Sequence, residues 1–198
     1  MNIDTSAAEA QYQTEWARML AGEKYEASNE RFLVMLRQTA EKVAHYNNIP
    51  AADVEARDWA IRGLLGSVGK NIVVNAPFRC DYGCNIHVGD NVIINFNMTV
   101  LDEGRVTIGN NVFIGPNCSI YTACHPLKAA ERNTLVQWTE PVTIGDNVWL
   151  GGNVTITPGV EIGAGSVIGA GSVVTKSVPA NSLAVGNPAR VIRQIDND

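Results

Sequence analysis

One histidine of this chain lies where a reactive side chain would be expected. The sequence has three histidines, and His125 lies in the segment Cys124-His125-Pro126, outside any regular pattern. An imidazole has an unperturbed pKa of about 6.5, so at neutral pH it can take a proton from an attacking hydroxyl. A positioned base of this kind typically accelerates a reaction about 10²–10⁴-fold. His125 is therefore a candidate general base, and the competing interpretation is a loop histidine with no catalytic task.

A second chemical signal is the charge of the C-terminal part. Residues 162–195 include no acidic side chain, whereas Lys176, Arg190 and Arg193 are present in a chain with a formal net charge of −5. Lysine and arginine are the usual donors to phosphate oxygens. These three cations mark a candidate site for a phosphate-bearing ligand. A basic strand that only solvates one end of the fold is the alternative.

The cysteines indicate no metal site. Cys80, Cys84, Cys118 and Cys124 match no zinc-binding spacing, and no cluster of histidines completes one. We therefore expect reduced thiols and no metal. A thiol beside an imidazole could also form an acyl-enzyme. Adjacent residues of an extended segment point to opposite sides, however, so Cys124 next to His125 favours direct transfer.

The elements that must position these groups fall into two parts, which we place at residues 1–69 and 70–198. In the first part, apolar residues recur with helical spacing over residues 11–20 and 30–46. A third helical segment follows Pro50, and its apolar residues are Val54, Trp59, Ile61, Leu64 and Leu65. We expect an N-terminal α-helical segment with amphipathic helices.

After residue 70 the period becomes six residues. An aliphatic residue occupies the first position of each hexad, and valine or serine follows four places later. The first positions are Ile144, Leu150, Ile156, Ile162, Ile168 and Val174, and the register recurs earlier at Val88, Ile94 and Val100. This period predicts a parallel β-helix, in which three hexads form one triangular coil of about 18 residues and the aliphatic side chains point inward.

Glycine and asparagine mark the predicted corners of the coil, because tight corners need a left-handed backbone that these residues adopt readily. Examples are Gly109-Asn110-Asn111, Gly145-Asp146-Asn147, Gly163-Ala164-Gly165 and Gly169-Ala170-Gly171. The hexads are interrupted at Asp102-Glu103-Gly104-Arg105 and again over residues 121–141. Neighbouring coils fill the core, so extra residues must leave it as loops, and loops on a rigid scaffold often carry function.

Composition excludes several classes of protein. With 45% hydrophobic and 18% charged residues the chain is not disordered, and no apolar run approaches the ~20 residues of a membrane span. A net charge of −5 argues against binding nucleic acid through the overall field. The first residues show no basic stretch followed by an apolar run, so we expect no secretory signal and a cytoplasmic protein.

Several motifs together resemble the hexapeptide-repeat acyltransferases, and among them the sugar O-acetyltransferases of the maltose and galactoside type. The resemblance covers nearly the whole chain. It implies a left-handed parallel β-helix, a homotrimer, and acetyl-CoA and acceptor meeting between neighbouring subunits. The matching segments are Ala21-Gly22-Glu23, Phe78-Arg79-Cys80-Asp81-Tyr82-Gly83, Asn95-Phe96-Asn97, Tyr121-Thr122-Ala123-Cys124-His125-Pro126, residues 141–152, Val173-Val174-Thr175-Lys176 and Gly186-Asn187-Pro188-Ala189-Arg190.

The resemblance also implies roles for particular residues. His125 matches the catalytic base of the family, and Asn95, Asp81 and Glu103 match positions that contact the acceptor. Carboxylates and amides suit polyol hydroxyls, which both donate and accept hydrogen bonds. The family can also use an acidic residue in the N-terminal segment, where this chain has Ala27, so the identity of the acceptor is less certain than the reaction.

On the acetyl-CoA side, the resemblance implies that Trp149 packs on the pantetheine arm and that cations bind the phosphates. The matching positions are Trp149, Gly152, Ala170, Thr175, Lys176, Arg190 and Arg193. Several relatives have serine where this chain has Gly152. A backbone N–H at this position can still stabilise a developing oxyanion.

Three other functions compete with transfer to a sugar. An acetyltransferase of the same fold could act on another small hydroxyl compound, such as an antibiotic or serine. A β-helical zinc carbonic anhydrase needs three histidines at one metal, and His45, His87 and His125 are far apart in sequence. A non-catalytic scaffold would not need both a base and a cationic end.

Overall fold

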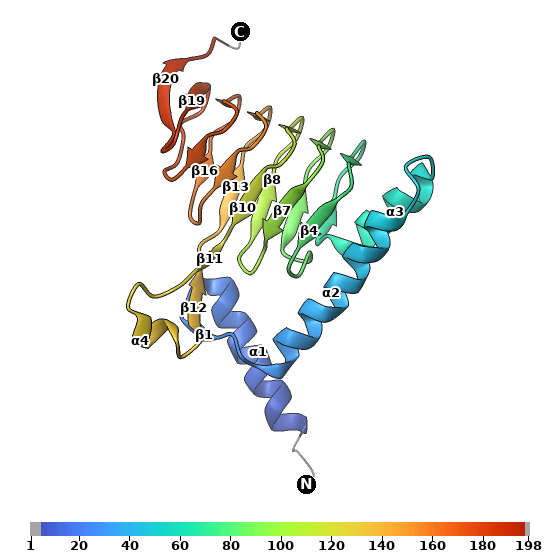
Figure 1. Cartoon of the computed structure of the whole chain (residues 1–198), viewed down its shortest axis with the longest axis vertical. Helices are drawn as coiled ribbons and strands as arrows, with labels where there is room; N and C mark the ends of the chain where they lie inside the picture. Colours follow the sequence, from blue (N-terminus) through green and yellow to red (C-terminus); the bar gives the residue numbers. More distant parts are fainter. Residues whose placement is uncertain (1–4, 197–198) are drawn as a thin grey trace.

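The computed structural model describes residues 5–196 and consists of a parallel β-helix with helices at one end (Figure 1). The helices are α1 (Thr5–Ala21), α2 (Glu30–Asn48) and α3 (Val54–Leu64). The Asn29 side chain accepts the N–H of Arg31 and caps α2, and Asp53 accepts the N–H of Ala56 and caps α3. Among the described residues, no helix is both long and apolar enough to cross a membrane.

The β-helix has three faces, which we number in chain order. Face 1 consists of β2 (Ser67–Val68), β5 (Ile86–Val88), β8 (Val106–Ile108), β13 (Val142–Ile144) and β16 (Glu161–Ile162). Face 2 consists of β3 (Val73–Val74), β6 (Ile93–Ile94), β9 (Phe113–Ile114), β14 (Trp149–Leu150), β17 (Val167–Ile168), β19 (Ser182–Val185) and β20 (Arg190–Gln194). Face 3 consists of β4 (Phe78–Cys80), β7 (Met98–Leu101), β10 (Ser119–Tyr121), β15 (Thr155–Ile156) and β18 (Val173–Val174).

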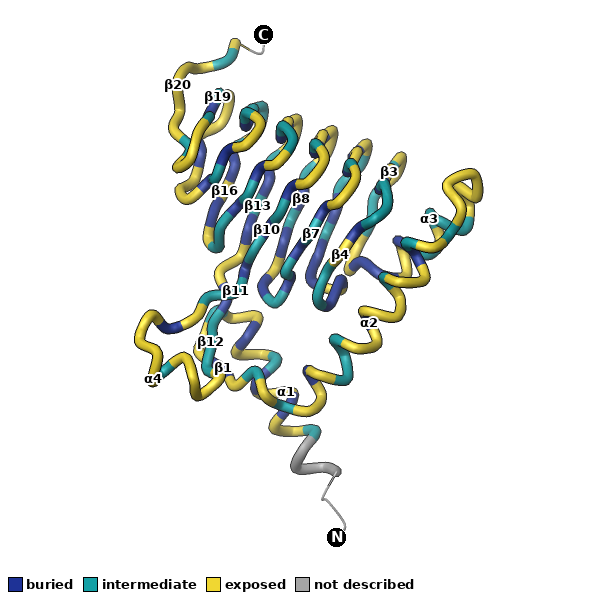
Figure 2. Tube along the Cα trace, in the orientation of Figure 1, coloured by how far each residue is buried: buried dark blue, intermediate teal, exposed yellow. Residues whose placement is uncertain are grey.

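The core is a set of ladders of identical or similar aliphatic residues. On face 2, Ile94 pairs with Ile114, Ile114 with Leu150, and Leu150 with Ile168. All four are buried, as are the valine and serine positions of the later hexads (Figure 2). The parallel β-helix and its inward-pointing positions are thus confirmed.

The length of a coil differs from the prediction in the first part of the β-helix. From Leu150 to Ile168 the paired residues are three hexads apart, as predicted. In the first coils, paired corner residues are 20 apart, because extra residues enter between faces 3 and 1 at 81–85 and again at 101–105. The sequence showed only the second of these insertions. The first strand of the β-helix, β2, begins at Ser67, just before the predicted boundary at residue 70.

The long interruption is extruded, as expected, and it forms a small hairpin with a helix. Strand β11 (Ala123–Cys124) pairs antiparallel with β12 (Val136–Thr139), and α4 (Ala129–Arg132) lies between them in the chain. Strand β12 also pairs with β1 (Tyr25–Glu26), which ties the extruded segment to the N-terminal helical part.

An aromatic cluster joins the helices to the β-helix. The rings of Tyr12, Trp16 and Phe32 come from the helices, and Tyr82 comes from the first inserted corner. Trp16 and Tyr82 meet edge to face with ring centroids 5.3 Å apart. This cluster fixes the helical part beside the corner between faces 3 and 1.

The predicted apolar face of the third helix is wrong in part. Val54 and Trp59 are 69% and 76% exposed, and α3 instead packs through Ile61 and Leu64. Helical spacing gives the period of a face but not which flank of that face meets the core.

The corner between faces 1 and 2 contains a ladder of asparagines. Asn91, Asn111 and Asn147 have φ of 57°, 55° and 59°. The Asn91 amide donates to Asn111 at 3.0 Å, and the Asn111 amide donates to Asn147 at 3.1 Å. Asparagine tolerates the left-handed region better than other side chains do, and it adds a hydrogen bond from coil to coil.

We predict that Asn111→Ala lowers the free energy of unfolding by about 1–2 kcal/mol, because alanine is strained at a positive φ. Asn111→Gly is the matched control, since it loses the same side-chain hydrogen bonds but adopts this φ without strain. Urea unfolding of both variants measures the difference. An equal loss in the two variants would contradict a role for backbone strain.

Candidate active site

His125 is exposed at the end of β11, on the segment extruded between faces 3 and 1. The chain around it is held on both sides. Arg132 Nη1 donates to the carbonyl of Pro126 at 3.0 Å, and Thr139 of β12 donates its hydroxyl to the carbonyl of Met19 at 2.6 Å. The imidazole is therefore open to a substrate, while the backbone that presents it is anchored to the helical part.

Cys124 is half-buried beside this histidine. Burial raises the pKa of its thiol, and the nearby negative charge of Glu140 adds to the effect. A thiolate is the reactive form of cysteine, so these surroundings disfavour an acyl-enzyme at Cys124.

Asp102 lies at the second inserted corner and is fully buried. Its Oδ1 accepts the N–H groups of Asp81 at 3.0 Å and Tyr82 at 2.9 Å, and its Oδ2 accepts that of Asn85 at 3.3 Å. Burial raises the pKa of this carboxyl, and the hydrogen bonds from the backbone oppose that rise. Asp102 thus fixes the turn that contains Asp81, and it was not predicted as a site residue.

Asp81 and Glu103 come together on this corner, one from each inserted turn. Their carboxyl groups are hydrogen-bonded to each other. Burial, followed by the negative charge of Asp81, raises the pKa of Glu103 to about 8. Burial also raises the pKa of Asp81.

Two tyrosines lie beside this acidic pair. Tyr25 of β1 and Tyr82 are both buried, and the negative charges of Glu103 and Asp81 act on both phenols. Gln137 of β12 donates its side-chain amide to the Tyr25 hydroxyl. The pair therefore lies where the coil, the helical part and the extruded segment meet.

Asn95 lies at a different corner, between faces 2 and 3. It follows β6, its N–H donates to the carbonyl of Ile114 at 3.0 Å, and its side chain is half-buried. The topology places His125 at the corner between faces 3 and 1. A single chain therefore groups His125 with Asp81 and Glu103 but leaves Asn95 on another corner.

The residues expected to bind acetyl-CoA are also divided between corners. Trp149 points outward from face 2 with 55% of its surface exposed, and Gly152 and Ala170 occupy the same corner as Asn95. Thr175 and Lys176 follow β18 at the corner between faces 3 and 1, and both are exposed. Arg190 and Arg193 are exposed on β20, which closes the C-terminal end of face 2.

Face 2 also exposes an outward apolar ladder that the sequence analysis missed. Its members are in register from coil to coil and are each at least about a third exposed: Val73, Ile93, Phe113 and Trp149. The outward residues of face 1 in the same coils are Ser67, His87, Thr107 and Thr143. The signal was available, because each apolar residue directly precedes an inward aliphatic one.

The other two histidines are accounted for differently. His45 is exposed on α2, as expected. His87 points outward on face 1, where its Nδ1 is 2.9 Å from the hydroxyl of Ser67, and partial burial lowers its pKa. Within residues 5–196, no group of three metal-ligating side chains comes together.

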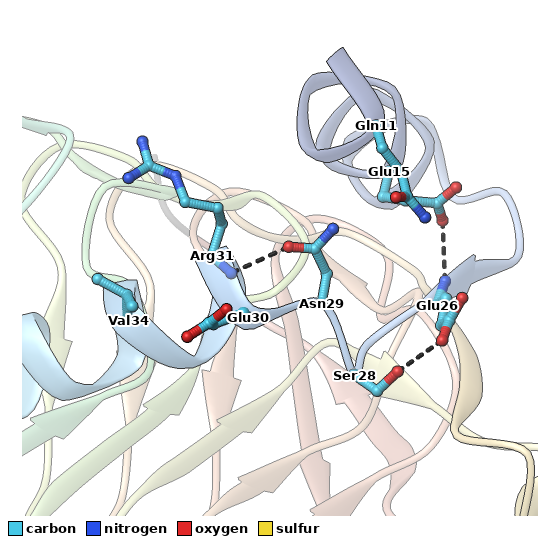
Figure 3. Close-up of a pocket in the computed structure, with 8 residues that line it drawn as sticks. All are labelled: Gln11, Glu15, Glu26, Ser28, Asn29, Glu30, Arg31 and Val34. Carbon is cyan, nitrogen blue, oxygen red and sulfur yellow. Dashed lines mark hydrogen bonds between the residues drawn. The ribbon is translucent and has the colours of Figure 1, made fainter. Parts of the chain in front are cut away.

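A hollow of about 370 Å³ lies between α1 and the start of α2 (Figure 3). Its polar groups already have partners: Glu15 accepts the N–H of Glu26 at 2.9 Å, and Asn29 caps α2. None of the predicted site residues lines this hollow.

Comparisons with known proteins match most of the chain. The family model for the maltose acetyltransferase hexapeptide capping motif matches residues 18–69. The models for the bacterial transferase hexapeptide and for the hexapeptide repeat of succinyl-transferase match residues 141–176 and 105–122.

Individual relatives agree with these models. A maltose O-acetyltransferase structure from Clostridium difficile is 48% identical, with a TM-score of 0.91, and the match covers 92% of this chain and 98% of that one. The galactoside O-acetyltransferase of Escherichia coli is 45% identical over 77% of this chain and 75% of its own length. A hexapeptide-repeat acetyltransferase from Vibrio cholerae, solved with acetyl-CoA, is 37% identical with a TM-score of 0.85, covering 92% of this chain and 99% of that one.

We predict that Asp102→Ala lowers the free energy of unfolding by roughly 2–3 kcal/mol, because it leaves buried N–H groups without an acceptor. Asp90→Ala is the matched control: Asp90 accepts the N–H of Lys70 at 2.7 Å, but on an accessible corner where water can replace it. Thermal and urea unfolding measure both. Equal losses would show that burial of the Asp102 hydrogen bonds has no special weight.

Proposed function

This chain is an acetyltransferase of the maltose and galactoside O-acetyltransferase family, and we propose that it transfers the acetyl group of acetyl-CoA to a hydroxyl of a small sugar. The observation that carries this proposal is the exposed His125 on an anchored segment, next to a corner that presents paired carboxyl groups. A base and a set of polyol-binding groups are what such a transfer requires.

In the proposed reaction, His125 takes the proton of the attacking sugar hydroxyl while the sugar oxygen bonds to the thioester carbon. The carbon–sulfur bond then breaks, and the imidazolium returns the proton to the leaving thiolate. The transfer is direct, in a ternary complex. The half-buried Cys124, with its raised pKa, supports a direct path rather than a covalent one.

Acceptor binding is assigned to Asp81, Glu103 and Asn95. Asp81 and Glu103 are polar groups beside the extruded segment, as a sugar-binding role requires. Ala27 packs against the aromatic cluster instead of supplying a carboxylate. This difference favours a second candidate acceptor class, a small hydroxyl compound other than maltose or a galactoside, and comparison of turnover across sugars, serine and hydroxylated antibiotics decides between the two.

Acetyl-CoA binding is assigned to the outward side of face 2 and the C-terminal cations. Trp149 offers an exposed indole surface to the pantetheine arm, and the Gly152 N–H would stabilise the oxyanion. Small residues at Gly152 and Ala170 allow a thin ligand to approach the coils. Thr175 adds a hydroxyl, and Lys176, Arg190 and Arg193 supply the positive charge for phosphates.

We place the site between copies of a homotrimer. Two features support this assembly: the outward apolar ladder of face 2, and Leu127, which is 96% exposed on the extruded segment beside His125. Apolar surface of this kind is typical of an interface between chains. A neighbouring copy would bring one chain's His125 to another chain's Asn95. The free cysteines fit a reducing compartment, so we place the enzyme in the cytoplasm.

We predict that His125→Ala lowers kcat at least ~10²-fold, because the attacking hydroxyl loses its base, while affinity for CoA changes little. His45→Ala is the control, since His45 is exposed on α2. Steady-state release of CoA thiol measures turnover, and calorimetry measures CoA binding. Unchanged kcat in His125→Ala would refute the assignment of the base.

A mixing experiment tests the site between copies. Asn95→Ala and His125→Ala are each expected to be nearly inactive alone. After unfolding and refolding together in equal amounts, about a quarter of the sites should combine an intact Asn95 with an intact His125, because random assembly of two chain types fills each position independently. No recovery of activity, with a trimer confirmed by light scattering, would place both residues in the site of one chain.

A further inference from the structure

We propose that Glu103 is a positioning residue: it donates a hydrogen bond to Asp81 as a carboxylic acid, and Asp81 then presents its remaining lone pairs to a hydroxyl of the acceptor. The inference rests on the proposed transfer to a sugar hydroxyl. It changes the role of Glu103 from a direct contact with the acceptor to support of the residue that makes the contact.

The geometry requires one shared proton. The carboxyl groups of Asp81 and Glu103 are hydrogen-bonded to each other. Neither group has a hydrogen to donate when both are ionised, and two adjacent carboxylates repel each other strongly. One of the two is therefore a neutral acid whenever this contact exists.

The surroundings assign that proton to Glu103. Its Oε2 is buried and has no hydrogen-bond partner, which is far more costly for an ionised oxygen than for a neutral one. The charges that act on it come from Asp81 and Asp102, and both are negative. Its pKa is accordingly raised to about 8, and its hydrogen bond lowers the pKa of Asp81.

The other titratable groups around the pair do not reverse this assignment. The Asp102 carboxylate is occupied by the N–H groups of Asp81, Tyr82 and Asn85. Burial raises the pKa values of the Tyr25 and Tyr82 phenols and of the Cys80 and Cys84 thiols, so these groups are neutral at pH 7. Gln137, which donates to Tyr25, is uncharged.

The consequence for the reaction is a fixed hydrogen-bond acceptor. The backbone N–H of Asp81 is bound by Asp102, and its side chain is bound by Glu103. A carboxylate held at both ends loses little freedom when it accepts a sugar hydroxyl. Above the pKa of Glu103 the second carboxylate would repel Asp81, and the orientation would be lost.

The first test is a titration that does not depend on activity. The full chain is labelled with ¹³C at the glutamate carboxyl carbons, and NMR spectra are recorded from pH 5 to pH 10. Comparison with Glu103→Gln identifies the Glu103 signal. We expect a titration near pH 8, and a titration near the ordinary value of about 4.3 would overturn the proposal.

The second test uses maltose as acceptor. In the wild type, KM for maltose should rise about tenfold between pH 7 and pH 9, since only about a tenth of the molecules then retain the proton. Glu103→Gln should match the wild type at pH 7 and stay constant to pH 9, because its amide donates to Asp81 without titrating. Glu103→Leu should show a raised KM at both pH values, with kcat less affected.

The outcomes separate this inference from the proposed function. An equal rise of KM with pH in Glu103→Gln and the wild type overturns the positioning role. So does an unchanged KM in Asp81→Asn. If the wild type does not acetylate maltose, the proposed sugar specificity fails, while the NMR titration still decides whether Glu103 holds the proton. Melting temperatures of all variants confirm that each is folded.

Discussion

The stacking of inward aliphatic side chains constrains everything else in this molecule. Ile94, Ile114, Leu150 and Ile168 lie directly above one another, so each strand must repeat the position of the last. Interiors are close-packed, and an extra residue has no space within such a stack. Insertions are therefore confined to corners. All polar groups proposed for the reaction lie at corners or on the outer surface for this reason.

The corner between faces 3 and 1 shows how that constraint creates chemistry. Two successive turns carry insertions, at 81–85 and 101–105, and the longer segment of residues 121–141 leaves the next coil at the same corner. The inserted turns are not covered by regular strand pairing, so their backbone N–H groups need other acceptors. Asp102 meets this need for Asp81, Tyr82 and Asn85. A buried carboxylate that organises one turn also sets the electrostatic surroundings of the carboxyl groups beside it.

Much of the fold could be predicted from the sequence because the period of the hexads is a property of the backbone. The inward ladder, the left-handed corner residues such as Asn111 and Gly165, and the extruded segment all follow from spacing. The exposed flank of α3 could not be predicted, since helical periodicity does not specify the neighbour. The role of Asp102 was equally hidden, because its partners lie about one coil earlier and meet it only after the coils stack. His125, Asp81 and Glu103 were found by resemblance, and sequence spacing alone would not have brought them together.

The distribution of the site over two corners has a further physical meaning. A rigid stack of coils cannot bend to bring Asn95 to His125, because both corners are fixed by the same ladders of packed side chains. Catalysis that needs both groups must therefore recruit a second copy of the chain. The exposed apolar ladder of face 2 gives such a copy a surface to cover, and Trp149 belongs to that ladder as well as to the proposed acetyl-CoA site. Assembly and cosubstrate binding would then use one continuous surface, so that loss of the assembly would remove the site without any change within a single chain.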